Sequence, residues 1–298
     1  MKRFNKNNLD TTLVIISYKS MSKVLEHIQI FYGILPIIII DNYGEEKLES
    51  EINNKFSNVK YFKKNNLGYG RAINFAAKYI NTKYFFVINP DLKISLEQFL
   101  KFERIIQDKE LKFFAIGPNI ESNLNQNLVK YSKLLSKVKD INGSAMFFCL
   151  QEFIEIGGFD EKIFLFFEEA DINLRAIKFG KNLFVATDIQ CAHMGSSSFD
   201  SKDKIEVEKL NHLLAWHGEW SRYYFYQKHY GIIFALIFSF QRMLKNFIQF
   251  SLNCIFRKKE KSLNYKYRLQ GMINSMLGRN SHLRIEFIRV SNKNGTAG

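Results

Sequence analysis

The stretch that most constrains the fold is residues 83–95, where a run of aromatic and β-branched residues stops at Asn89-Pro90-Asp91. Six mostly apolar residues bounded by a proline fit the length of a buried strand better than that of a helix. Asp91 then lies just past the carboxyl end of a strand, where open α/β sheets bind ligands. Its carboxylate suits a hard divalent cation. The alternative is that Pro90-Asp91 is only a turn and that Asp91 helps to cap a helix beginning near Ser95.

Apolar runs elsewhere in the first half fit further strands, and the segments between them fit helices. Strands are predicted at residues 12–18, 36–41 and 59–62, and helices at residues 21–32 and 71–80. This alternation predicts an α/β fold with a Rossmann-like, mostly parallel central sheet flanked by helices. No glycine-rich dinucleotide fingerprint follows the first strand, where Ser17-Tyr18-Lys19-Ser20 stands instead, and this weakens an oxidoreductase interpretation.

Three polar clusters follow the predicted strands, at residues 17–20, 41–42 and 89–91. Because the carboxyl ends of parallel strands meet at one edge of a sheet, we expect the three clusters to lie together there. Asp41 could accept a hydrogen bond from an imide N–H such as N3 of uracil or thymine, since an ionised carboxylate only accepts. Turn chemistry before the next helix is the other interpretation of Asp41-Asn42.

The second half of the α/β region predicts strands at residues 113–119 and 140–150, separated by a polar segment, residues 121–139, that we interpret as a flexible insertion. Small residues at 143–145 permit the close approach of a ligand or of another backbone. Glu168, Glu169 and Asp171 then open a predicted helix that ends near Gly180. Acids are favoured in a first helical turn, and Asp171 can pair with Arg175 four residues on. That role explains Asp171 but not two adjacent glutamates after a Phe-rich run.

Seven segments in this order resemble the family 2 glycosyltransferases with a GT-A fold, and most of all their rhamnosyltransferase-like branch. The segments are LVIISYKS, IIIIDN, NNLGYGRAIN, FFVINPDL, NGSAMFF, GGFDEKIFLFFEEADINLR and AHMGSSS, spread over residues 12–200. The resemblance implies an inverting transfer of a sugar from a nucleoside diphosphate sugar, assisted by Mg²⁺ or Mn²⁺.

The resemblance also implies roles for single residues. Asp41 matches the family's base-binding Asp, and Asn89-Pro90-Asp91 replaces the metal-binding Asp-x-Asp, with Asp91 as the remaining ligand. Glu168-Glu169 stands where the family has Glu-Asp, so Glu169 is the expected catalytic base and Glu168 the reserve candidate. His193 resembles a late histidine near the metal and the diphosphate, although a structural role is the alternative. The other expected residues are Ser17, Tyr18, Asn66, Gly68, Arg71 and Asn89 on the donor side, and Gly143, Ser144 and Asp171 on the acceptor side.

The composition limits the cellular setting. Cys149, Cys191 and Cys254 have neither paired nor metal-ligand spacing, which is typical of thiols in a reducing compartment. The start of the chain lacks the apolar core of a signal peptide, and no apolar run reaches the roughly 18–20 residues that span a bilayer. We therefore expect a cytoplasmic protein, peripheral on the inner face of the cell membrane.

Basic charge is concentrated near the C-terminus. The chain has a net charge of +14, and residues 257–298 hold ten Lys or Arg against two Glu, which makes +8. Such a segment suits an anionic partner, either a membrane surface or a nucleic acid.

The boundaries that we expect are a GT-A catalytic domain over residues 1–200 and a helical, basic extension over residues 201–298. Residues 202–230 are predicted to be helical and carry an aromatic band. Residues 231–256 have apolar side chains at helical spacing with polar ones between them, as in an amphipathic helix at a bilayer interface. We expect residues 231–268 to contact the membrane; a helix packed on the catalytic domain or on a partner subunit is the alternative.

The most specific interpretation is a transferase that extends a lipid-linked or polymeric glycan in bacterial surface polysaccharide synthesis. dTDP-rhamnose is the first expectation for the donor, with UDP-sugars close behind. A basic nucleic-acid-binding protein would place its charge on the main domain, whereas the excess lies in the tail, so we expect no nucleic acid partner. A non-catalytic scaffold of the same shape would have lost its acids, yet Asp41, Asp91 and Glu169 remain.

Overall fold

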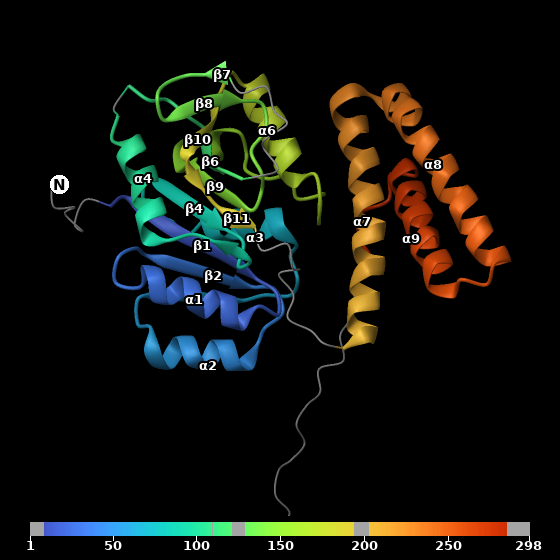
Figure 1. Ribbon diagram of the computed structural model, residues 1–298, viewed down its shortest axis with the longest axis horizontal. Helices are drawn as coiled ribbons and strands as arrows, with labels where there is room; N and C mark the ends of the chain where they lie inside the picture. Colours follow the sequence, from blue (N-terminus) through green and yellow to red (C-terminus); the bar gives the residue numbers. More distant parts are fainter. Residues whose placement is uncertain (1–8, 109, 121–128, 194–202, 285–298) are drawn as a thin grey trace, which may run out of the picture. The chain divides into compact units, whose positions relative to one another are not determined.

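The computed structural model describes residues 9–108, 110–120, 129–193 and 203–284 of the 298 in the chain. The chain forms two compact units, Met1–Asp200 and Ser201–Gly298 (Figure 1). Each unit is described separately below.

The first unit is built on a nine-stranded sheet in the order β3-β2-β1-β4-β9-β6-β10-β8-β7. Its strands are β1 Thr11–Ser17, β2 Ile37–Asp41, β3 Val59–Lys63, β4 Tyr84–Ile88, β6 Ala115–Asn119, β7 Val129–Lys130, β8 Leu135–Val138, β9 Ala145–Cys149 and β10 Leu183–Gln190. Strands β3, β2, β1 and β4 pair in parallel, and β9 is antiparallel to both β4 and β6. A second sheet pairs β5, Leu92–Lys93, with β11, Ala192–His193. The mostly parallel sheet of the predicted fold class is thereby confirmed.

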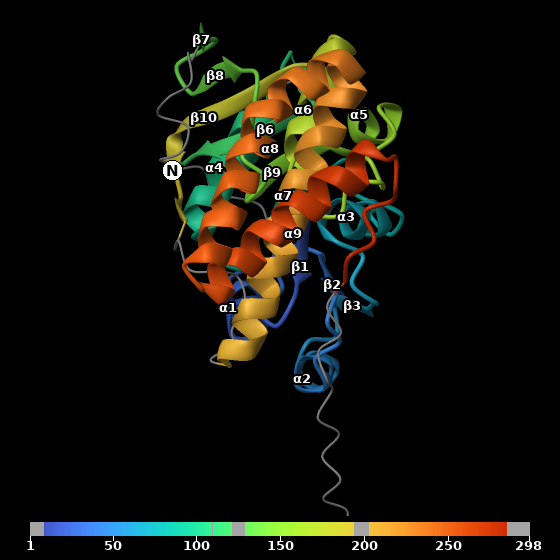
Figure 2. The same ribbon diagram turned by 90° about the vertical axis from the view of Figure 1, so that its right-hand side faces the viewer.

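Helices cover both faces of the sheet, because successive residues of its buried strands point to opposite sides. Leu13 and Ile15 of β1 pack with one group of helices, whereas Val14 and Ile16 pack with the other. Figure 2 shows one helix of each group, α4 and α3, on opposite sides of the sheet. The first group is α1 Met21–Phe31, α2 Glu46–Lys55 and α4 Leu96–Ile106; the second is α3 Tyr69–Ala77, α5 Leu150–Glu155 and α6 Glu168–Lys178. The predicted strands and helices of the first half are confirmed to within a few residues.

The interpretation of residues 121–139 as a flexible insertion is wrong over residues 129–138, while residues 121–128 lie outside the described part. Strands β7 and β8 pair there, and β8 joins the sheet through β10. The turn between β7 and β8 is fixed by the Ser132 hydroxyl, which accepts from the N–H groups of Leu134 and Leu135 at 3.2 and 3.1 Å. Strands of two and four residues are too short to show a clear alternation in sequence.

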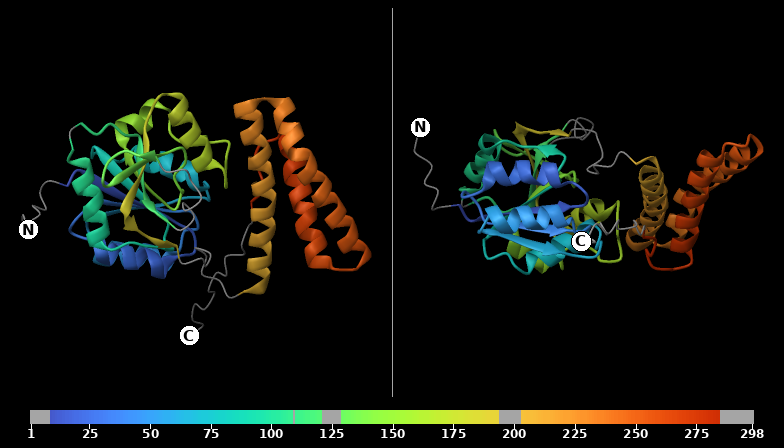
Figure 3. Two further views of the ribbon diagram at one scale, coloured as in Figure 1. Left: turned by 45° about the horizontal axis from the view of Figure 1, so that its top comes forward. Right: turned by 90° about the horizontal axis from the view of Figure 1, so that it is seen from below.

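The second unit consists, in its described part, of three helices, α7 Lys204–Tyr230, α8 Ile232–Ile255 and α9 Lys259–Met276 (Figure 3). Helix α9 approaches α7 closely at Gly271, where a Cβ atom would lie only 2.0 Å from the carbonyl oxygen of Trp216. The sequence predicted the first two helices and a helical extension, but not α9 itself. None of the described helices is long and apolar enough to cross a membrane.

The chain beyond α9 is held against α7 by a buried histidine. The Leu283 carbonyl lies 2.9 Å from Nε2 of His217, and the Ser281 hydroxyl lies 3.1 Å from Nδ1. A carbonyl only accepts, so Nε2 carries the proton and Nδ1 accepts from the hydroxyl. Burial lowers the pKa of His217 to about 3, which keeps the imidazole neutral.

Glu103 should make the stability of the protein depend on pH. This residue of α4 is buried, accepts a hydrogen bond from the Thr11 hydroxyl, and burial raises its pKa from 4.5 to about 7. Because the folded pKa is raised, its contribution is complete below pH 4.5 and is lost as the pH rises through 7. The Glu103→Gln variant keeps the acceptor atom, and we expect it to be about 3 kcal/mol more stable than the wild type above pH 8. Urea unfolding across this pH range tests this; parallel pH profiles of the two proteins would contradict it.

Candidate active site

Three strand ends of the parallel part of the sheet define one edge. Ser17 lies opposite Asp41 in the β1–β2 register, and Ile15 lies opposite Ile88 in the β1–β4 register. The polar residues that follow β1, β2 and β4 therefore share this edge, as the sequence predicted.

Asp41 at the end of β2 is fully buried and bonded locally. Its two carboxylate oxygens accept from the N–H groups of Tyr43 at 2.9 Å and Glu45 at 2.7 Å, and from the Tyr61 hydroxyl at 2.6 Å. Burial and this carboxylate raise the pKa of Tyr61 well above its usual range. The turn interpretation of Asp41 is confirmed, and its contact with a base stays a prediction.

Aromatic and hydroxyl groups lie beside the ends of β1 and β2. The Ser17 and Ser20 hydroxyls are 3.1 Å apart, and the ring of Tyr18 meets that of Tyr43 edge-on at 5.8 Å. The ammonium group of Lys19 lies 4.6 Å from the centre of the Tyr43 ring. This part of the edge thus offers flat apolar surfaces with a positive charge close by.

The loop before α3 is fixed by close contacts rather than left open. Asn42 holds it with two hydrogen bonds, one to the Gly68 carbonyl at 3.1 Å and one from the Leu67 N–H at 3.2 Å. Gly68 has φ +80°, and a Cβ atom there would lie 2.3 Å from the carbonyl oxygen of Phe164. The Asn66 side chain accepts from the Gly68 N–H at 3.1 Å, and Nε of Arg71 donates to the Glu161 carbonyl. The sequence did not reveal Asn42 as the residue that holds this loop.

The turn that carries Asp91 is joined to the start of β9. The N–H of Asn89 donates to the Ser144 carbonyl at 2.8 Å. Pro90 and Asp91 do form a turn, and the N-cap of helix α4 is Ser95, whose hydroxyl accepts from the Gln98 N–H at 3.2 Å. The β5–β11 pairing sets the backbone of His193 opposite Leu92, next to Asp91; the side chain of His193 lies outside the described part.

The two glutamates begin α6 after an unusual turn of the chain. Phe166 and Phe167 both have φ +67°, a left-handed conformation that bulky residues rarely adopt. Glu168 is 7% exposed, and burial together with the neighbouring Glu169 raises its pKa well above the usual range. Burial also raises the pKa of Glu169, whose side chain is the more exposed of the two. A carboxyl with a raised pKa is suited to taking up a proton near neutral pH.

Tyr69 and Gly143 connect the glutamates with the Asp91 turn. The Tyr69 hydroxyl donates to the Gly143 carbonyl, and a Cβ atom on Gly143 would lie 3.3 Å from that of Glu169. Burial and the charges of Glu168, Glu169 and Asp91 raise the pKa of Tyr69. These three carboxyl groups therefore lie near enough to this hydroxyl for their charges to act on it. The sequence missed Tyr69, because its partner is 74 residues away.

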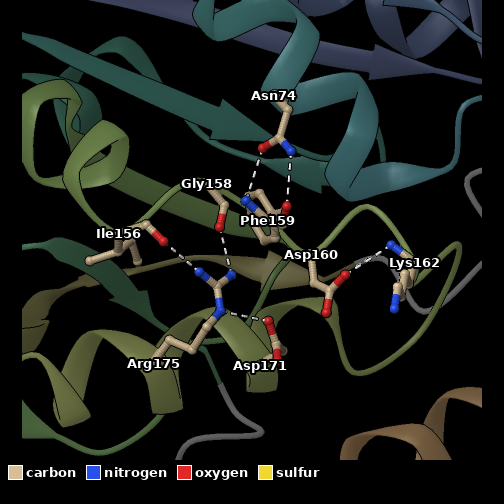
Figure 4. A network of polar contacts seen from close by, with 8 residues as sticks. All are labelled: Asn74, Ile156, Gly158, Phe159, Asp160, Lys162, Asp171 and Arg175. Atoms are coloured by element: carbon tan, nitrogen blue, oxygen red, sulfur yellow. Dashed lines mark hydrogen bonds and ion pairs between the residues drawn. The ribbon is translucent and has the colours of Figure 1, made fainter. Parts of the chain in front are cut away.

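Asp171 pairs with Arg175 as the sequence predicted. Nε of Arg175 donates to the Asp171 carboxylate at 2.8 Å, and its other nitrogens donate to the carbonyls of Ile156 and Gly158 at 2.8 and 2.6 Å (Figure 4). Asn74 of α3 holds the same loop through Phe159, with two bonds of 2.9 Å (Figure 4). Asp171 is fully buried, so its acceptor-side role stays a prediction that this burial disfavours.

The described residues suit a divalent cation that is bound by one protein carboxylate together with the phosphate groups of a substrate. No group of three His, Cys, Asp or Glu side chains capable of holding a metal occurs in the described part of the chain. Mg²⁺ is usually bound by one or two carboxylates together with substrate phosphates and water. The single carboxylate of Asp91 at the strand end fits that mode of binding.

Comparison with protein families and known structures shows what the first unit is similar to. The model of the family described as "Glycosyl transferase family 2" matches residues 17–144, which include Asp41, Asp91, Gly143 and Ser144. This part of the chain is similar to the family 2 glycosyltransferases. The match ends before Glu168 and Glu169. In the fold, the start of α6 nevertheless lies at the same edge, because Glu169 is next to Gly143.

Individual glycosyltransferases are also similar to this chain. The low-salt glycan biosynthesis hexosyltransferase Agl10 of Haloferax volcanii is 22% identical over 232 residues, which cover 69% of this chain and 75% of that protein. The mannosyltransferase PcManGT of Pyrobaculum calidifontis, solved with GDP-Man and Mn²⁺, is 10% identical with a TM-score of 0.55, covering 91% and 88% of the two chains.

A second solved structure, GalNAc-T7 with UDP, GalNAc and Mn²⁺, is 16% identical with a TM-score of 0.53 and covers 75% of this chain. The present chain spans about half, 51%, of the GalNAc-T7 chain. At these identities the two structures show the shared fold, and the GT-A architecture that the sequence predicted is confirmed.

Arg175 should contribute strongly to stability because it ties the start of α6 to the preceding loop. Arg175→Met removes three hydrogen bonds and leaves the buried Asp171 carboxylate without its cation, so we expect a loss of about 3 kcal/mol in the free energy of unfolding. Lys162→Met, in the same loop with an exposed side chain, should change it by less than about 0.5 kcal/mol. Equal losses in the two variants under urea unfolding would contradict this.

Proposed function

We propose that this protein is an inverting glycosyltransferase that moves a sugar from a nucleoside diphosphate sugar to a hydroxyl group of a glycan acceptor. The observation that carries the proposal is the placement of Asp91, Glu168 and Glu169 at one edge of a domain similar to family 2 glycosyltransferases, where Ser144 and Gly143 lie between them. One carboxyl group at a strand end and two at a helix start are what donor binding and acceptor activation require.

Glu169 is the proposed base. The acceptor hydroxyl must lose its proton as its oxygen attacks the anomeric carbon, and a carboxylate within hydrogen-bond reach can take that proton. The new bond forms on the face opposite the departing diphosphate, which inverts the configuration. Glu169 is the more exposed of the two glutamates, whereas Glu168 is buried, and its Oε2 has no hydrogen-bond partner among the described residues. Glu168 therefore stays the reserve candidate.

Asp91 is the residue proposed to hold Mg²⁺ or Mn²⁺ together with the diphosphate oxygens, with His193 as a second candidate ligand. A bound cation neutralises negative charge on the leaving diphosphate. On the nucleotide side, Tyr18, Tyr43 and Lys19 supply stacking surfaces and a positive charge. dTDP-rhamnose is our first proposal for the donor and UDP-sugars the second. The PcManGT and Agl10 relatives support a hexosyl donor more broadly.

Replacing Glu169 tests the catalytic assignment. Glu169→Gln should lower turnover by roughly 10² to 10⁴, the usual contribution of a general base, while leaving donor binding unchanged. Glu168→Gln, the matched change one residue away, should keep turnover within about tenfold of the wild type. Release of nucleoside diphosphate from a panel of dTDP-, UDP- and GDP-sugars measures both. A Glu169→Gln variant with near-normal turnover would disprove the assignment.

The raised pKa of Glu169 also predicts the pH dependence of turnover. A base must be ionised to act, so kcat should fall as the pH drops through the folded-state pKa of Glu169, which lies above 4.5. The Glu169→Gln variant should show no such acidic limb in its residual rate. An acidic limb that persists in this variant would assign the titration to another group.

We further propose that the second unit binds a membrane surface, where a lipid-linked glycan would be extended. Helix α8 supports this through the distribution of its side chains. Its buried positions are Ala235, Ser239, Asn246 and Asn253, three of them polar. Its exposed large side chains are Ile232, Ile233, Phe234, Leu236, Ile237, Phe238, Phe240, Leu244, Phe247, Ile248, Leu252 and Ile255. An apolar outer face this long is typical of a helix that lies in a bilayer interface.

The charged residues of the second unit also agree with an α8 that lies on a membrane surface. Glu219 of α7 is 1% exposed and binds Arg242 of α8 at 2.6 Å, with Arg268 of α9 at 3.5 Å. Polar pairing therefore holds α8 to its neighbours, while its apolar side chains remain outside. Exposed Arg257, Lys258, Lys259 and Lys261 follow α8 and would attract anionic lipid. This supports a bilayer of anionic lipid, rather than a protein partner, as what covers the apolar face.

Charged substitutions on α8 test the membrane proposal. Ile233→Glu with Ile237→Glu places two carboxylates in the apolar face, and we expect at least tenfold weaker binding to vesicles that contain phosphatidylglycerol. Ile205→Glu on α7, where the isoleucine is 63% exposed, is the matched control and should bind as the wild type does. Flotation with and without phosphatidylglycerol measures this. A wild-type protein that floats with neither lipid, or a double variant that floats normally, would contradict the proposal.

A further inference from the structure

One large apolar residue, Phe166, precedes the two glutamates in the chain and has no clear place in the core. Phe166 is 41% exposed, although most phenylalanines of the first unit are buried. Its ring makes no aromatic or cation–π contact with another described residue. Phe164, two residues earlier, is by contrast buried in the fold. The exposed ring of Phe166 therefore has no evident role in folding.

The backbone at this point is held in an unfavourable conformation. Phe166 and Phe167 both have φ +67°. At this angle a side chain crowds its own backbone, and only glycine adopts the conformation without strain. The structure fixes the segment on both sides: the Tyr69 N–H donates to the Phe164 carbonyl at 3.3 Å, and the Asp171 N–H donates to the Phe167 carbonyl at 2.8 Å. Strained residues over-determined in this way cluster at functional sites. A glycine would remove the strain at residue 166, but it would also remove the ring.

We propose that Phe166 is the surface on which the sugar ring of the acceptor lies while its hydroxyl is presented to Glu169. This rests on the proposed role of Glu169 as base. The two positions are three residues apart in the sequence, so their Cα atoms are no more than about 11 Å apart. A pyranose has a face of C–H groups, and an aromatic ring complements such a face through apolar contact and the attraction of C–H for the π-system. The side chain of Phe166 has no polar atom, so it would contact the C–H face of the sugar rather than a hydroxyl group.

Sugar binding without turnover tests the proposal. Saturation-transfer NMR would measure the affinity of the intact protein for methyl α-rhamnopyranoside, methyl α-mannopyranoside and methyl β-glucopyranoside. We expect saturable binding of at least one of them, weakened about five- to tenfold by Phe166→Ala. Phe179→Ala removes a phenylalanine that is 60% exposed at the other end of α6 and should leave the affinity unchanged. Unchanged affinity in Phe166→Ala, equal losses in both variants, or no binding by the wild type would overturn the proposal.

A second variant, Phe166→Gly, separates a loss of sugar binding from a loss of folding. Phe166→Gly should melt at a higher temperature than Phe166→Ala, because glycine adopts φ +67° without strain, and should lose sugar binding to the same extent. Normal sugar binding by a well-folded Phe166→Gly protein would overturn the proposal.

Failure of this proposal can be told apart from failure of the glycosyltransferase function. Phe166→Ala should keep any stabilisation by a nucleoside diphosphate sugar with Mn²⁺, and Glu169→Gln should keep its affinity for the methyl glycosides. If the wild type gains no stability from any such donor, the proposed function fails, whatever the methyl glycosides show. If donors stabilise the protein but Phe166→Ala binds the glycosides normally, only the role of Phe166 fails.

Discussion

The antiparallel pairing of β9 with β4 is the contact on which the candidate site depends. Because β9 runs against its neighbour, its first residues lie at the edge where β4 ends, and the Asn89 N–H reaches the Ser144 carbonyl at 2.8 Å. Gly143, one residue earlier, then meets both Glu169 and the Tyr69 hydroxyl. A parallel strand in this position would have placed Gly143 at the opposite edge, far from Asp91. One reversed strand thus joins a strand-end carboxylate to a pair of glutamates about 80 residues later in the chain.

The sequence predicted the parts of this site that depend on local signals. The apolar runs of β1, β2 and β4 are long enough to identify buried strands, and Pro90 marks where the last of them ends. The acids that open α6 and the Asp171–Arg175 pair follow from helical spacing alone. These features need no knowledge of tertiary contacts.

The features that the sequence did not reveal depend on contacts between distant segments. Tyr69 bonds to a residue 74 positions away, and Asn42 holds a loop 25 positions away. Strands β7 and β8 are too short for their alternation to stand out, and α9 mixes charged and aromatic residues without a clear apolar stripe. Asp41 could be read as a turn residue or as a base-binding residue, and only the structure shows how many local donors it already accepts from.

The two units differ in how they use polar side chains. In the first unit, buried apolar strands carry polar residues to one edge, where burial raises the pKa values of Glu168 and Glu169. In the second, α8 turns polar residues inward and apolar residues outward, which suits contact with lipid rather than with water. This difference is the basis of our proposal that the first unit handles a nucleotide sugar and that the second binds a membrane surface.

If Asp91 holds a cation together with the donor at this edge, the melting temperature of the protein should depend on the donor, on the metal and on Asp91. The wild type and Asp91→Ala would be heated with dTDP-, UDP- and GDP-sugars, each with and without Mg²⁺ or Mn²⁺. A donor at 100 times its Kd stabilises the native state by about 2.7 kcal/mol, roughly 5–10 °C for a domain of this size. We expect such a shift for the wild type with one class of nucleotide sugar. The shift should require the metal and should be lost in Asp91→Ala. No shift with any donor, or the same metal-dependent shift in Asp91→Ala, would contradict it.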